Sequence, residues 1–223
     1  VTYRIRKGLT WGDGVPVTSD DIRFTWEVGK HPESGVTGAD VYQRIWKIET
    51  PDARTAVLHT DRVTYDYNAF GVEPLPAHLE RPVFEADPRG YKQRTLYDRE
   101  TTNPGLYFGP YRVAEVSAGA FTALERNPYW QGPMPYFDRI VVRIIPNTAA
   151  LEANLLSGAV DYIAGSLGLT LDQALSLEQR RGGDFDFIYK AGLIYEHLDV
   201  NLSNPVLADR RVRQALLYGV DRQ

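Results

Sequence analysis

Two turns rich in glycine, proline and aromatic residues enclose a pair of short alternating segments near the middle of the chain. Residues 105–113 read GLYFGPYRV, and residues 124–130 read LERNPYW. Apolar and polar residues alternate over 111–116 and 120–126, as they do in half-buried strands, and the glycine between them suits a tight turn. The pattern predicts an antiparallel β-hairpin, and therefore a sheet, in this part of the chain.

Strand and helix signals alternate along the rest of the sequence. Strands are expected from alternation at residues 1–6, 56–60, 139–145, 161–163, 185–189 and 195–201. Helices are expected from caps and apolar stripes at about 18–29, 148–160, 170–180 and 209–220. Strands interleaved with helices indicate a mixed α/β fold.

A third motif, LTWGDGVPVTSDD at residues 9–21, joins a glycine turn to a helix start. We expect Trp11 to be buried, and Gly14 to hold the turn, because glycine tolerates positive φ. Thr18 suits the N-cap, and acidic residues in the first turn favour the positive end of the helix dipole. Capping explains Asp20 and Asp21 better than a metal site or an acid/base pair does.

Composition excludes several classes of protein. The chain has 223 residues, enough for one large or two modest domains, and 43% of them are hydrophobic, which indicates a globular protein. The net charge of −4 provides no basic field for nucleic acid. No apolar run approaches the ~18 residues of a membrane span. Cysteine is absent, which excludes disulfides, thiolate metal sites and cysteine nucleophiles.

Signatures of catalysis are missing from the sequence. There is no G-x-S-x-G elbow and no glycine-rich phosphate loop, and the four histidines lack the spacing of a metal motif. A pair of carboxylates brought together by the fold remains open, because any two acids can meet in space. The sequence therefore favours a binding protein over an enzyme and predicts neither a cofactor nor a metal.

The ends of the chain fall inside predicted elements. A strand begins at Val1 without an initiator methionine or a signal peptide, and a helical stripe runs on to Gln223. We expect the chain to be an internal segment of a longer protein.

Three segments, at residues 9–21, 105–130 and 201–216, resemble in order and spacing the peptide-type (dipeptide, oligopeptide and nickel) solute-binding proteins of bacterial ABC importers. The resemblance implies a periplasmic-binding-protein-like lobe plus an accessory domain, with the second lobe missing. Residues 1–103 would form the accessory α+β domain. Residues 104–223 would form the returning part of the first lobe and end at the hinge. Less than half of a family member would be covered.

The function implied by this resemblance is capture of a small peptide, or another small solute, and its delivery to an ABC permease in the membrane. The protein would act as a monomer in the periplasm or elsewhere outside the cytoplasm, with a lipid anchor as an option, and would bind no nucleic acid. The alternatives are a ligand-sensing domain of a transcription regulator and, ranked last, a hydrolase.

Candidate ligand contacts lie on two loops and one predicted strand. Loops supported by a scaffold carry binding residues more often than core strands do, and alternate residues of a strand share one side. In the family, a strand just before the Asn-x-x-x-Pro turn lines the cleft, although this row could instead pack under the neighbouring lobe. The candidates are Tyr42, Tyr107, Phe108, Gly109, Tyr195, His197 and Asp199.

Overall fold

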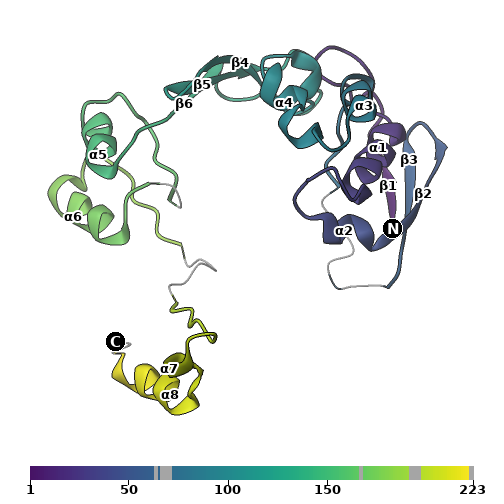
Figure 1. Cartoon of the computed structure of the whole chain (residues 1–223). Helices are drawn as coiled ribbons and strands as arrows, with labels where there is room; N and C mark the ends of the chain where they lie inside the picture. Colours follow the sequence, from purple (N-terminus) through teal and green to yellow (C-terminus); the bar gives the residue numbers. More distant parts are fainter. Residues whose placement is uncertain (63–64, 66–71, 166–167, 191–196, 221–223) are drawn as a thin grey trace. The chain divides into compact units, whose positions relative to one another are not determined.

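A computed structural model describes residues 1–62, 65, 72–165, 168–190 and 197–220 (Figure 1). The chain divides into two compact units, Val1–Ala150 and Leu151–Gln223. Strands of the first unit are β1 (Thr2–Arg4), β2 (Ile45–Asp52), β3 (Thr55–Thr60), β4 (Tyr111–Ser117), β5 (Phe121–Arg126) and β6 (Arg139–Arg143). Its helices are α1 (Ser19–Lys30), α2 (Ala39–Gln43), α3 (Ala77–Ala86), η1 (Tyr91–Gln93), α4 (Leu96–Arg99) and η2 (Pro104–Leu106). The fold is mixed α and β, as predicted.

A three-stranded antiparallel sheet in the order β1-β3-β2 packs against α1 (Figure 1). Alternate residues of its strands face inward, so Ile48 and Leu58, which are paired in the register, are both buried. Ile22 of α1 joins them in a core that also contains Trp11. The predicted helix at 18–29 and the predicted strand at 56–60 are confirmed.

The opposite side of α1 packs against α3. Phe24 and Val28 form a second buried cluster with Phe84 and Tyr91. The ring of Phe84 meets the rings of Phe24 and Tyr91 edge to face, with centroids 6.0 and 5.3 Å away. Helix α1 is therefore covered on two sides, which explains why its buried residues do not form a single stripe.

The predicted hairpin is present and is extended by a third strand. The sheet has the order β4-β5-β6, with Leu124 paired to Val113 on one side and to Ile140 on the other. Gly119 turns the hairpin at φ 74°, a conformation that glycine adopts without strain. Local pairing of this kind is the easiest to predict, because turn and alternation agree.

The predicted domain boundary near residue 103 falls inside the first unit. Leu106 is 2% exposed, and its carbonyl accepts a hydrogen bond from the Tyr97 hydroxyl at 2.9 Å. The Gly12 N–H donates to the Tyr107 carbonyl at 2.7 Å. Residues just after the predicted boundary are thus held by residues before it. The assignment of 1–103 and 104–223 to an accessory domain and a returning lobe stays a prediction.

Helices are the regular secondary structure in the described part of the second unit. Its helices are α5 (Thr148–Leu156), α6 (Leu171–Arg181), α7 (Pro205–Ala208) and α8 (Arg210–Gly219). The first three residues of α5 belong to the first unit. The predicted helices at about 170–180 and 209–220 are confirmed: Thr170 begins α6, and Asp209 begins α8 by accepting the Arg211 N–H at 2.8 Å. Arg211 is exposed, whereas Arg213 donates to the Leu207 and Ala208 carbonyls at the end of α7.

The strands predicted at 161–163, at 185–189 and in the described part of 195–201 are wrong, because these residues form no strand. Their alternating apolar residues are largely exposed, as Tyr162, Ile188 and Leu198 show. Alternation indicates one buried face, but a strand also needs a neighbour to complete its hydrogen-bond ladder. The described part of the second unit provides no such neighbour.

None of the helices that the structure describes has both the length and the apolar character needed to cross a bilayer.

A buried carboxyl group links α3 to α4. Glu80 is fully buried, and its Oε1 accepts the Leu96 N–H at 2.8 Å. Among the described residues, Glu80 Oε2 and the Tyr91 hydroxyl are buried without a hydrogen bond of the usual geometry. They still influence each other: the Tyr91 hydroxyl lowers the pKa of Glu80, and the Glu80 carboxylate raises the pKa of Tyr91. Burial is the main cause that raises the pKa of Glu80, and the Leu96 N–H opposes it.

This raised pKa predicts how stability depends on pH. The folded protein binds the Glu80 proton more tightly than the unfolded chain does. Protonated Glu80 therefore contributes its full stabilisation below the ordinary pKa of about 4.3. This stabilisation is lost as pH rises through the raised pKa of Glu80 in the folded protein. Glu80→Gln should remove that loss and raise the unfolding free energy at pH 8 by on the order of 1 kcal/mol.

Urea unfolding at several pH values between 4 and 8 tests this expectation, with Glu85→Gln, an exposed position on the same helix, as the control. The gap between Glu80→Gln and wild type should shrink toward pH 4. A gap that stays constant with pH would contradict the assignment.

Candidate functional site

Residues 106–110, here called the anchored segment, run from the end of η2 to the start of β4. Hydrogen bonds to their main-chain carbonyl groups hold them in place. Tyr107 is extended, with φ −125° and ψ 133°. Four hydrogen bonds hold the carbonyls, and each comes from another part of the first unit. The donors are Tyr97 Oη to Leu106 O (2.9 Å), Gly12 N to Tyr107 O (2.7 Å), Asn127 Nδ2 to Gly109 O (2.9 Å) and Asn127 N to Pro110 O (2.9 Å).

The middle of the anchored segment keeps main-chain groups available. Among the described residues, no hydrogen bond is made by the N–H groups of Phe108 and Gly109 or by the Phe108 carbonyl. Gly109 also borders open space, because a Cβ built on it would meet only the Tyr111 carbonyl oxygen, at 4.0 Å. Its φ lies outside the left-handed region, so the missing side chain is not required by the backbone. Another main chain can approach here.

Two half-buried aromatic side chains border these groups. The Tyr107 hydroxyl donates to the Thr101 carbonyl at 2.6 Å, and burial raises its pKa. The Phe108 ring meets the Trp11 ring edge to face, with centroids 5.1 Å apart. Both rings are fixed by these contacts and still keep part of their surface exposed.

The turn at residues 11–14 supports the anchored segment from one side. Trp11 is 0% exposed, and Gly14 has φ 89°, so both predictions for this motif are confirmed. Asp13 closes the turn by accepting the Val15 N–H at 3.0 Å. Its other oxygen lies 2.9 Å from Nε2 of His78 at the start of α3. The turn is thus fixed to α3 as well as to the segment.

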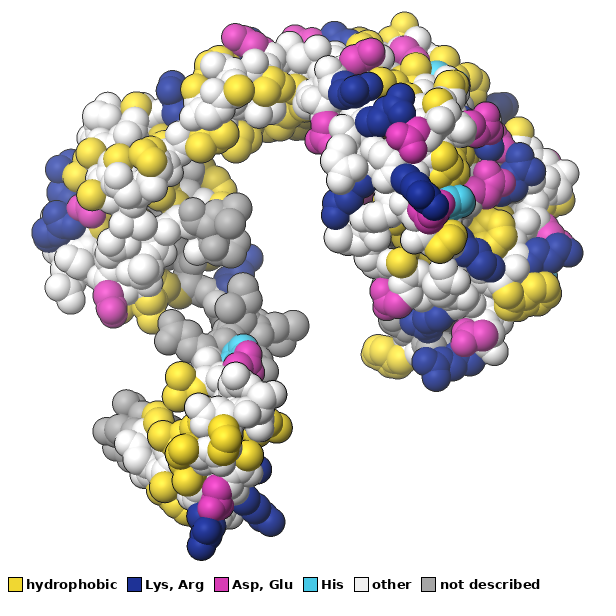
Figure 2. Space-filling view, viewed as in Figure 1, with side chains coloured by type: hydrophobic (Ala, Val, Ile, Leu, Met, Phe, Trp, Pro, Cys, Tyr) yellow, Lys and Arg dark blue, Asp and Glu magenta, His cyan; other side chains and the backbone are white. Residues whose placement is uncertain are grey.

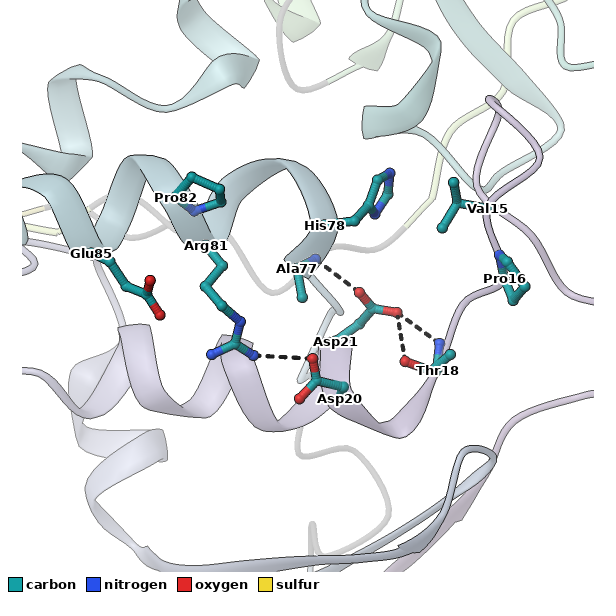
Figure 3. A pocket seen from close by; sticks show the side chains of 10 residues that line it. All are labelled: Val15, Pro16, Thr18, Asp20, Asp21, Ala77, His78, Arg81, Pro82 and Glu85. Atoms are coloured by element: carbon teal, nitrogen blue, oxygen red, sulfur yellow. Dashed lines mark hydrogen bonds and ion pairs between the residues drawn. The ribbon is translucent and has the colours of Figure 1, made fainter.

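Asp21 ties the same turn to two helices (Figure 3). The residue is 3% exposed. It accepts the N–H groups of Thr18 at 2.7 Å and Ala77 at 2.8 Å, and the Trp11 indole N–H at 3.4 Å. Burial raises its pKa, and these hydrogen bonds oppose the rise. Capping is confirmed for Asp21, whose carboxylate accepts the Thr18 N–H, whereas Asp20 pairs with Arg23 and Arg81.

An open hollow of about 470 Å³ lies between α3 and the start of α1 (Figure 3). Its charged groups mostly pair with one another or with close neighbours: Arg81 contacts Asp20 and Glu27, and His78 contacts Asp13. Side chains of both signs are interspersed over the visible face of the first unit (Figure 2). The hollow therefore lacks a group of converging, unpaired polar side chains.

Of the predicted ligand contacts, Tyr107, Phe108 and Gly109 lie together on the anchored segment. Tyr42 packs on α1, where a Cβ on Gly29 would lie 2.3 Å from its ring, and burial raises its pKa. His197 and Asp199 are exposed residues of the second unit, with His197 Nε2 3.2 Å from Asp199 Oδ2. Tyr195 lies outside the described residues. In the described part, no three His, Asp or Glu side chains gather where they could hold a metal ion.

The sequence did not lead us to predict a role for Asn127 in supporting the candidate site. It is 4% exposed, and it holds the carbonyls of both Gly109 and Pro110. A signal was available, because an asparagine before a proline often caps a turn through its side chain.

Comparison with known proteins identifies the family of this chain. The family described as "Bacterial extracellular solute-binding proteins, family 5 Middle" matches residues 1–223. The chain belongs to this family. A binding protein of Brucella melitensis is 26% identical to it over 97% of the chain. The chain spans about 35% of the length of that relative.

Solved structures of solute-binding proteins share the fold. The oligopeptide-binding protein of Thermus thermophilus, complexed with a pentapeptide, has a TM-score of 0.78 and 28% identity, covering 98% of this chain and 42% of that one. NikZ of Campylobacter jejuni, in complex with Ni(L-His), has a TM-score of 0.79 and 22% identity, covering 99% and 41%. The second likeness shows the fold alone.

Proposed function

We propose that the chain is part of a solute receptor that captures small peptides outside the cytoplasm and delivers them to an ABC-type permease, without catalysis and as a monomer. The observation that supports it is the anchored segment. Fixed carbonyls on either side hold the free N–H groups of Phe108 and Gly109 in place, and Gly109 leaves room for a second main chain.

A peptide can pair with the Phe108 N–H and carbonyl as it would pair with one residue at the edge of a sheet. Extended peptides bind by main-chain pairing, which depends little on their side chains. The rings of Tyr107 and Phe108 give flat apolar surfaces beside the pairing groups, and such surfaces accept varied side chains. This combination suits a receptor that takes up peptides of many sequences.

The other predicted residues are proposed to contact the ligand as well. Tyr195, His197 and Asp199 would add polar and aromatic side chains, and Tyr42 would add one ring. Closure of two lobes around the solute would bury these contacts before delivery.

Gly109→Ala tests the proposal, because the structure separates binding from folding at this position. A Cβ fits without a clash and without a forbidden φ, so the unfolding midpoint should not change. A methyl group placed where the peptide main chain approaches should weaken binding about tenfold or more, equal to ~1.4 kcal/mol. Calorimetry with mixtures of di- to pentapeptides on the longest natural form of the protein measures this.

Gly183→Ala is the matched control, since a Cβ there meets nothing within 4 Å and likewise fits without a clash. It should alter neither stability nor affinity. Equal affinity of wild type and Gly109→Ala would refute a ligand contact at Gly109. Absence of peptide binding by the wild type would refute the solute class.

A further inference from the structure

Asn127 performs two tasks with the two ends of one side-chain amide. Its Oδ1 accepts the Tyr129 N–H at 3.0 Å, which closes the turn at 127–130. Its Nδ2 donates to the Gly109 carbonyl at 2.9 Å, on the anchored segment. The residue is 4% exposed, so neither bond is readily replaced by water. One task stabilises a turn, and the other fixes a main-chain group 18 residues away.

We infer that Asn127 is a positioning residue for ligand binding: it sets where Gly109 and its free N–H stand without touching the ligand. The inference rests on the proposed function of the anchored segment. It goes beyond that function by naming the group that keeps the segment ready for binding.

The contacts explain why this group matters more than others nearby. The Gly12 N–H holds the segment at Tyr107, and Asn127 holds it at Gly109 and Pro110. Phe108 and the free N–H groups lie between these two points. If the Asn127 side-chain bond is lost, the Gly109 carbonyl is released, and rotation about the backbone bonds of Gly109 can turn the preceding peptide, which carries the Gly109 N–H, into other orientations. Apparent affinity then falls in proportion to the fraction of molecules in the competent orientation.

Asn127→Asp separates the two tasks. A carboxylate still accepts the Tyr129 N–H, but it cannot donate to the Gly109 carbonyl and repels it. We expect peptide affinity at pH 8 to fall about tenfold, and amide hydrogen exchange to become faster over residues 107–111 only. Affinity is measured at a temperature at which the variant is fully folded. A merely structural role would move the unfolding midpoint but not the affinity of the folded protein.

Asn147→Asp is the matched control. Within the described part of the chain, Asn147 uses only its side-chain Oδ1, which accepts the Ala150 N–H at 2.8 Å, so the same chemical change there should leave affinity and exchange unchanged. Should Asn127→Asp fail to fold, Asn127→Ser takes its place. A serine hydroxyl can accept the Tyr129 N–H but is too short to reach Gly109, and the same tenfold loss is expected.

Gly109→Ala distinguishes the two proposals. Weaker binding by Gly109→Ala together with unchanged binding by the folded Asn127 variant overturns the positioning role and leaves the proposed function standing. Unchanged binding by both variants overturns the ligand contact itself, and with it this inference. Weaker binding by both, with local loss of exchange protection in the Asn127 variant, supports the two together.

Discussion

Trp11→Ala is expected to lower the unfolding free energy by about 3–5 kcal/mol, the range for a fully buried large aromatic residue. Trp11 is 0% exposed. Its removal takes away the edge-to-face contact with Phe108 and leaves a cavity beneath the anchored segment. The Trp11 indole N–H also contacts Asp21, so that carboxylate loses a donor. Urea unfolding followed by far-UV circular dichroism measures the loss.

Trp46→Ala is the control for this change. Trp46 lies on β2 in the same unit but is 56% exposed, so its replacement should cost less than about 1 kcal/mol. If the two variants lost similar stability, Trp11 would not be the plug that its burial indicates.

Asp21→Ala is expected to have an effect of similar size, about 3–5 kcal/mol, for a different reason. The substitution leaves the Thr18 and Ala77 N–H groups and the Trp11 indole N–H without their acceptor in a buried site. Each buried donor left unsatisfied costs about 1–3 kcal/mol. The start of α1, the start of α3 and the glycine turn should all loosen together, which hydrogen exchange at these three places would reveal.

Asp20→Ala, one residue earlier, separates this role from the charge. Asp20 is half-exposed and forms ion pairs with Arg23 and Arg81, and exposed pairs contribute only about 0–1 kcal/mol. A large loss at Asp20 with a small loss at Asp21 would reverse our assignment of the two carboxylates.

Local signals in the sequence predicted several elements of both units, but not β2, α2 or α4. The hairpin of β4 and β5 and the starts of α1, α6 and α8 each depend on residues within one turn of the chain, so propensity and structure agree there. Strands at 161–163 and 185–189 were wrong because alternation reports a preference and does not provide a partner strand. Pairing partners come from the tertiary fold, which a single sequence does not specify.

The candidate site was predictable in part. Tyr107, Phe108 and Gly109 are adjacent in sequence, so one motif identified all three. Asn127, Trp11 and Gly12 support them from 18 to more than 90 residues away. No periodicity connects such distant positions. The contacts that fix the segment were therefore visible only in the structure.

The anchors of residues 106–110 are main-chain carbonyl oxygens, which every amino acid carries. Exchanging a side chain in this stretch leaves these four hydrogen bonds in place and changes only the packing that the old side chain provided. Single substitutions here should therefore cost the surrounding structure little stability. Under the proposed function, a new solute preference can arise by point mutation in this stretch while the supporting turns stay the same.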